Sequence, residues 1–109
     1  MDLKRGDVVI VVMQGDYGKP RPALIIQSDL FSETASVVIL PITSTRIEAP
    51  LLRVEIPADA ETGLRVPSDL MVDKVLTVRR DRIGQVIGQA PEEVTQAASR
   101  NLAVFLGIA

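Results

Sequence analysis

Short apolar runs rich in β-branched residues, each ended by glycine, proline or polar residues, limit how this chain can fold more than any other feature. The first run, 7–12, follows Gly6 and is almost wholly apolar, which favours a strand buried on both faces. Further strands are predicted at 23–27, 36–42, 51–56, 70–78 and 84–87, with one short helical turn at 79–83. This pattern predicts a mainly β fold.

Helical spacing occurs only near the C-terminal end. After Pro91, the apolar residues that recur at this spacing are Val94, Ala97, Ala98, Leu102, Phe105 and Leu106. Glu92 and Glu93 stand at the favourable N-terminal end of such a helix, and Gly107 can end it. Short strands followed by one helix predict a small, strongly bent sheet or barrel closed by a C-terminal α-helix. No repeat or linker interrupts the 109 residues, so we expect one domain, 1–109.

The chain contains neither cysteine nor histidine. Thiolate nucleophiles, zinc fingers, iron–sulfur clusters and every mechanism that uses imidazole are therefore excluded. A net charge of −2 gives no overall attraction to nucleic acid, so such a contact would need a local cationic face. The longest apolar run, Val8 to Met13, is far shorter than the roughly 20 residues of a membrane span. With no signal peptide apparent, we expect a cytoplasmic protein.

Arg21 is the first residue that points to chemistry. It lies between Pro20 and Pro22 in the segment 14–22, whose glycines and prolines predict a loop with an extended backbone at Arg21. A guanidinium stays protonated and cannot act as an ordinary base, but its planar fork binds phosphate oxygens. The alternative is a solvated surface cation. Tyr17, in the same loop, could stack on a base.

A cluster of hydroxyls, Thr43, Ser44 and Thr45, follows the predicted strand 36–42. Hydroxyls at the end of a strand either cap backbone groups or bind a phosphate. Arg46 adds a donor that could reach the same ligand. The sequence alone leaves both interpretations open.

Asp69 and Asp73 are four residues apart, which places them on one face of an uninterrupted strand. Two carboxylates can bind a divalent metal or share a proton. No further ligand occurs at a fitting spacing, so we expect no metal site. Surface ion pairing is the simpler interpretation, with the nearby cations Lys74, Arg79, Arg80 and Arg82. Lys4 and Arg5 are interpreted as a solvated N-terminus rather than a nucleic-acid contact.

Taken in order, several segments resemble the MazF/PemK (Kid-like) family of toxin–antitoxin endoribonucleases. These segments are 4–9, 18–26, 38–44, Asp73, 83–84 and 87–88. The resemblance covers essentially the whole chain. It implies an SH3-like β-barrel of the MazF/PemK/CcdB type with a C-terminal helix. It also implies a homodimer whose interface forms an RNA groove, and a MazE-like antitoxin as partner, without any membrane association.

The resemblance further implies cleavage of single-stranded RNA, usually mRNA, without metal or cofactor. The RNA 2′-OH would attack the adjacent phosphorus, leaving a 2′,3′-cyclic phosphate and a 5′-OH. By motif, Arg21 falls on the catalytic arginine of the family and Thr43 on its hydroxyl, while Asp73 is the candidate general base. Substrate contacts are expected from Tyr17, Lys19, Ser44 and Arg46.

One departure from the family pattern and two alternative functions bear on this interpretation. Some relatives carry an arginine where this chain has Met71, so that proton donation would fall to Lys19 or Arg46. CcdB-like gyrase poisons resemble the same fold, and residues 101–108 are similar to their C-terminal segment. Those toxins carry a tryptophan where this chain has Leu106, which favours the ribonuclease. A catalytically silent binding module of the same fold is a further alternative.

Overall fold

A computed structural model of the protein describes residues 1–12 and 18–109. The strands are β1 (Asp7–Val12), β2 (Pro20–Ile25), β3 (Ser36–Thr43), β4 (Arg53–Ile56), β5 (Ser68–Met71), β6 (Leu76–Arg79) and β7 (Ile83–Gln89). Short 3₁₀ turns occupy η1 (Asp29–Phe31), η2 (Val72–Lys74) and η3 (Arg80–Arg82), and one helix, α1 (Glu92–Phe105), follows β7. The prediction of a mainly β fold with a C-terminal helix is confirmed.

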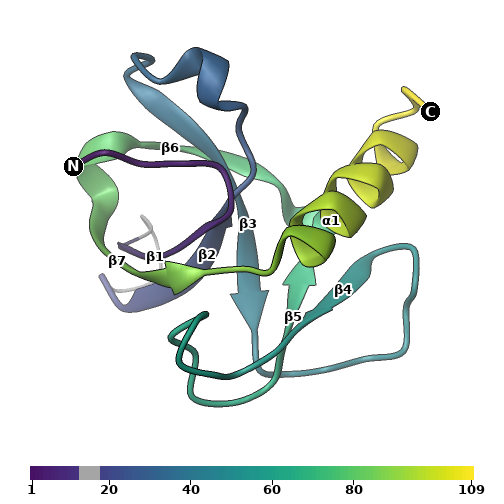
Figure 1. Ribbon diagram of the computed structural model, residues 1–109. Helices are drawn as coiled ribbons and strands as arrows, with labels where there is room; N and C mark the ends of the chain where they lie inside the picture. Colours follow the sequence, from purple (N-terminus) through teal and green to yellow (C-terminus); the bar gives the residue numbers. More distant parts are fainter. Residues whose placement is uncertain (13–17) are drawn as a thin grey trace.

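The strands form one antiparallel sheet in the order β4-β5-β3-β2-β1-β7, and β6 also pairs with β3. Strands β6 and β7 therefore lie at opposite edges of the five-stranded part β6-β3-β2-β1-β7. Five flat strands would be about 19 Å wide, whereas the three residues of η3 can bridge at most about 14 Å. The sheet must therefore curl, as Figure 1 shows. Strands β4 and β7 end the path and do not pair among the described residues, so closure into a barrel stays a prediction.

Apolar side chains form a core on each face of the sheet. Val8 and Leu24 lie on one face and pack with Ala98 of α1. Val9 and Ile39 lie on the other, beneath the N-terminal segment and the start of β7. All five side chains are fully buried, and each of the four valine, leucine and isoleucine side chains contributes up to about 1.5–3 kcal/mol on burial. The prediction that 7–12 is a strand buried on both faces is confirmed.

The prediction of one strand at 70–78 was wrong in one respect, because η2 divides this segment into β5 and β6. Both halves pair with β3, where Ile42 faces Leu70 and Ile39 faces Leu76. The residues on β3 are three apart and their partners are six apart, so η2 takes up the excess. Val72 within η2 is fully buried, which explains why the apolar pattern continues through the break.

The prolines beside Arg21 lie in a strand rather than a loop, which corrects the interpretation of 14–22. Strand β2 begins at Pro20, and Arg21 faces Val11 across the ladder with β1. Strand β3 pairs only with residues 23–25 of β2. Among the described residues, the edge of β2 that faces β3 therefore has no sheet partner at Pro20 and Pro22. A strand tolerates proline, which lacks an N–H, at such an unpaired edge.

Arg5 is a structural junction, so its interpretation as part of a solvated N-terminus was wrong. Its guanidinium donates to the Ile26 carbonyl at 2.5 Å and to the Ser99 hydroxyl on α1. Nearby, the buried Asp7 carboxylate accepts from the Lys4 N–H and from Gln89 at the end of β7. These bonds tie the N-terminal segment to both β7 and α1.

Helix α1 lies against β4 and η2 at one side of the sheet, as Figure 1 shows. It begins after Pro91 as the spacing predicts, and Gly107 follows its end with a φ of +76°. Among the described residues, no helix combines the length and apolar character needed to cross a membrane.

The segment between β4 and β5 is pressed against β7 at two glycines. A Cβ at Gly63 would stand 2.2 Å from the Ile87 carbonyl oxygen, and one at Gly88 would stand 2.4 Å from the Glu61 and Thr62 carbonyl oxygens. Thr62 is fully buried, and its hydroxyl donates to the Pro57 carbonyl at 2.8 Å. Backbone contact with β7 therefore fixes this segment in place.

Gly88→Ala is expected to destabilise the protein by about 1–3 kcal/mol, because the new methyl group would clash with backbone atoms that cannot move away. Gly84→Ala in the same strand is the matched control, since its Cβ would meet nothing closer than the Ile10 oxygen at 3.8 Å. Chemical denaturation of both variants measures the difference. Equal midpoints for the two variants would contradict the close contact at Gly88.

Candidate functional site

The pairing of β2 with β3 brings Arg21 and Thr43 together. Ala23 faces Pro41 in this ladder, and the same register continued by two residues places Arg21 level with Thr43. Both residues line a groove of about 400 Å³. The two positions that sequence motifs single out independently therefore meet at one place.

The groove combines cationic, hydroxyl and aliphatic surfaces. Its polar lining includes Arg21, Arg65, Thr43, Ser44, Thr45 and Ser68. Its apolar lining includes Ile10, Pro22, Ile42, Leu64, Val66 and Ile87. The described lining contains two guanidinium groups and no carboxylate. Such a groove favours an anion with apolar parts, and phosphate oxygens match the fork of an arginine.

The Thr43 hydroxyl combines the two roles that the sequence left open. Its oxygen accepts from the Thr45 N–H at 3.1 Å, so it caps the turn after β3. A hydroxyl that accepts one bond still has its own proton to donate. Thr43 can therefore hold the turn and donate to a ligand in the groove at the same time.

Arg65 is a groove residue that the sequence analysis missed. It belongs to the polar segment between β4 and β5, which resembles an ordinary surface excursion in the sequence. Gly63 was the available signal: its φ of +74° and its contact with Ile87 hold this segment against β7. Only the fold brings Arg65 to the same groove as Arg21, because the segment between β4 and β5 is distant from β2 in the sequence.

Three of the remaining predicted site residues do not line the groove. Lys19 is exposed beside the start of β2, and Asp73 is exposed in η2, beyond the end of β5. Arg46 forms ion pairs with the carboxylates of Glu55 and Asp69, outside the groove. Tyr17 lies outside the described residues, so its predicted role stays a prediction.

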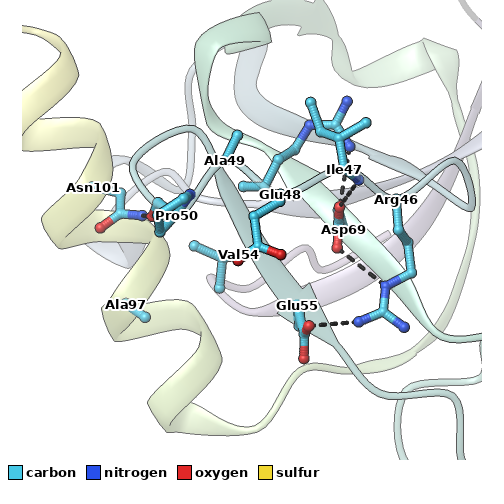
Figure 2. A pocket seen from close by; sticks show the side chains of 11 residues that line it. Arg46, Ile47, Glu48, Ala49, Pro50, Val54, Glu55, Asp69, Ala97 and Asn101 are labelled. Carbon is cyan, nitrogen blue, oxygen red and sulfur yellow. Dashed lines mark hydrogen bonds and ion pairs between the residues drawn. The ribbon is translucent and has the colours of Figure 1, made fainter.

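Figure 2 shows a second pocket, of about 650 Å³, where Arg46 and Asp69 meet. The Asp69 side chain is only 3% exposed and lies 3.1 Å from Arg53 Nη1 and 3.5 Å from Arg46 Nε. Arg46 Nη2 also contacts Glu55 Oε1 at 2.6 Å. The prediction that Asp69 pairs with the cations of 74–82 was wrong, because η2 interrupts the strand and leaves Asp73 apart.

The Asp69 cluster holds the segment that follows the groove hydroxyls. Asp69 Oδ2 accepts from the Ile47 N–H at 3.3 Å, and Arg53 Nη1 donates to the Thr45 carbonyl at 2.9 Å. In the ladder between β3 and β5, Asp69 faces Thr43 itself. The buried carboxylate thus fixes the backbone on which Thr43 and Ser44 stand.

The described residues contain no group of three or more carboxylates that could hold a metal ion. In the second pocket, the carboxylates of Asp69 and Glu55 are paired with the guanidinium groups of Arg46 and Arg53. Polar atoms in the groove are hydroxyls and guanidinium groups, which are donors suited to an anionic ligand.

A curled antiparallel sheet, one C-terminal helix and a groove whose described lining is cationic define a small, mainly β protein. A model of the PemK-like, MazF-like toxins of type II toxin–antitoxin systems matches residues 4–106, and the chain belongs to this family. A Mycolicibacterium smegmatis protein named as a probable endoribonuclease MazF is 46% identical over 108 residues, covering 98% of this chain and 99% of that protein.

Two solved structures have the same fold. An endoribonuclease from a mycobacterial species, in complex with its cognate antitoxin, is 26% identical with a TM-score of 0.81, covering 98% of this chain and 97% of that chain. A chain of the MazE–MazF crystal structure from Deinococcus radiodurans has a TM-score of 0.81 at 23% identity, covering 100% and 99% of the two chains.

Asp69→Asn is expected to destabilise the protein by about 2–4 kcal/mol, because removing one partner of a buried ion pair leaves the other charge uncompensated. The matched control is Asp81→Asn, whose partner Arg79 is exposed like Asp81 itself; there the change should stay within about 0.5 kcal/mol. Denaturant titration measures both. A similar loss of stability in the two variants would show that the ion pairs of Asp69 stabilise the protein no more than an exposed ion pair does.

Proposed function

We propose that the protein is an endoribonuclease that cleaves single-stranded RNA by attack of the RNA's own 2′-OH on the adjacent phosphorus. The observation that carries this proposal is the groove itself, where Arg21, Thr43 and Ser44 meet and the described lining contains no carboxylate. Membership of the MazF-like toxin family and the 46% identical relative named as an endoribonuclease support it.

The proposed chemistry needs no nucleophile from the protein. The 2′-OH oxygen forms the new bond to phosphorus, the bond to the 5′-oxygen breaks, and the products are a 2′,3′-cyclic phosphate and a 5′-OH. Negative charge grows on the phosphoryl oxygens during this step. Arg21 stabilises that charge, and the Thr43 proton orients the phosphoryl group. The absence of histidine and cysteine is compatible with this route.

Ser44 adds a second hydroxyl beside Thr43, where it can contact the scissile phosphate or the preceding nucleotide. Bases would rest on the aliphatic part of the groove, whose described lining has no aromatic side chain. Stacking on aromatic rings is a main source of affinity for single strands. Phosphate contacts should therefore dominate binding here, with a strong dependence on salt.

The proposal includes a homodimer that shares the RNA groove and an antitoxin that covers it. Apolar side chains stand exposed at the C-terminal end of α1, at Val104, Phe105, Leu106 and Ile108, and would be covered by association. The similar mycobacterial endoribonuclease was solved with its cognate antitoxin. A partner with acidic residues would compete with RNA for the cations of the groove.

Asp73 is retained as the candidate general base, although it is exposed in η2 and lies outside the groove of its own chain. In a homodimer with a shared groove, the second copy would have to supply it. Lys19 and Arg46 are the candidates for proton donation, and the ion pairs of Arg46 with Glu55 and Asp69 make Lys19 the stronger of the two.

Arg21→Ala is expected to lower RNA cleavage at least a hundredfold, because it removes the group that stabilises the phosphoryl charge. Cleavage of a mixed-sequence RNA is measured by gel, with thermal unfolding and sedimentation to check fold and association. Arg82→Ala is the control, since Arg82 is an exposed cation in η3 outside the groove.

Undiminished cleavage by Arg21→Ala would contradict the assigned role. Asp73→Asn made in parallel decides the proton transfer: a loss close to that of Arg21→Ala assigns the base to Asp73, and full activity removes it from the mechanism. Wild-type protein that leaves RNA intact and inhibits DNA gyrase would replace the proposal with the CcdB-like alternative.

EDTA is expected to leave cleavage unchanged, since Arg21 supplies the charge that a metal ion would otherwise supply. A substrate with 2′-deoxy sugars should resist cleavage completely, because it lacks the attacking oxygen. End-group analysis should find 5′-OH and 2′,3′-cyclic phosphate ends. Dependence on Mg²⁺, or 5′-phosphate ends, would contradict the 2′-OH route.

A further inference from the structure

We infer that Arg65 forms a second phosphate-binding subsite in the groove, which holds the RNA phosphate next to the scissile one. This inference rests on the proposed function, because it assigns a further contact to the same RNA. Arg65 lines the groove together with Arg21 and Thr43, and its side chain is exposed to the ligand.

Several other arginines already bind groups of the protein itself. Arg46, Arg53 and Arg79 pair with carboxylates, and Arg5 and Arg80 donate to backbone carbonyls. In the part of the chain that the structure describes, the ion pairs involve Lys4, Arg46, Arg53 and Arg79, and none involves Arg65. Its charge is therefore available to a ligand.

The backbone on both sides of Arg65 is anchored. On one side, Gly63 packs against Ile87, and the Leu64 N–H donates to the buried Thr62 hydroxyl at 3.3 Å. On the other side, the buried Ser68 hydroxyl donates to the Val66 carbonyl at 2.9 Å. Because the segment is held on both sides of Arg65, its backbone needs little ordering when the guanidinium binds, which lowers the entropic cost of binding.

The chemistry of the groove favours phosphate over a base edge as the partner of Arg65. Arg21 takes one phosphate by the proposed mechanism, and successive phosphates along a single strand are separated by one nucleotide. The aliphatic surface of Leu64 and Ile87 lies in the same groove and suits the intervening sugar and base. A phosphate contact positions the strand but reads no sequence.

The test compares Arg65→Gln and Arg65→Lys with Arg82→Gln, an exposed cation outside the groove. The binding probe is a short mixed-sequence RNA with 2′-O-methyl sugars, which cannot be cleaved by 2′-OH attack. We expect Arg65→Gln to bind about tenfold more weakly, with the slope of log K against log salt reduced by about 0.7. Arg65→Lys should lie between Arg65→Gln and the wild type, and Arg82→Gln should match the wild type.

Kinetics on cleavable RNA separate binding from chemistry. Arg65→Gln should raise KM about tenfold and keep kcat within about twofold, because the contact exists before and during the reaction. Binding and salt slope equal to the wild type would overturn the inference. So would a loss in kcat alone, or relaxed specificity at a single base position, since the latter indicates a base contact.

The outcome for the wild type separates this inference from the proposed function. Wild-type protein that cleaves RNA while Arg65→Gln behaves identically overturns the Arg65 subsite alone. Wild-type protein that neither binds the 2′-O-methyl RNA nor cleaves the unmodified RNA overturns the proposed function, and the subsite with it. Unchanged thermal unfolding of Arg65→Gln, expected for an exposed residue, ensures that a loss reflects the missing guanidinium.

Discussion

Strand β3 is the element on which the rest of the structure depends, because both of its edges are paired and both of its faces are buried. It pairs with β2 along one edge and with β5 and β6 along the other. Leu40 packs into the core beneath α1, and Ile39 packs into the core on the opposite face. The strand ends in Thr43, so the most constrained strand of the sheet delivers the groove hydroxyl to its position. The same register with β2 places Arg21 beside it.

An acidic protein can present a cationic groove because its carboxylates are used elsewhere. Asp69 and Glu55 form ion pairs with Arg46 and Arg53 in the second pocket, and Asp7 accepts hydrogen bonds near the N-terminus. The described lining of the groove contains Arg21 and Arg65 and no carboxylate side chain. The overall charge of −2 is therefore a poor guide to the field that a ligand meets at the groove.

Local patterns predicted what depends on neighbours in sequence. The run 7–12 and the helix after Pro91 follow from apolar spacing, and Arg21 with Thr43 stood out through their flanking residues. What failed depended on partners distant in sequence. The break at η2 exists because two segments share β3, and the partners of Asp69 arrive from β4 and from the segment after β3. Arg65 was missed for the same reason, since backbone contact with β7 brings it to the groove.

That backbone contact has a consequence for how such a groove can vary. Gly63 and Gly88 let two backbones meet where no side chain fits, so the spacing between this segment and β7 is set by the absence of two side chains. The width of the groove therefore depends on Gly63, which lines it, and on Gly88, which does not. A family member with a larger residue at either position must hold this segment, and the cation on it, farther from the strand. A substitution at Gly88 can then change substrate fit without altering any residue that lines the groove.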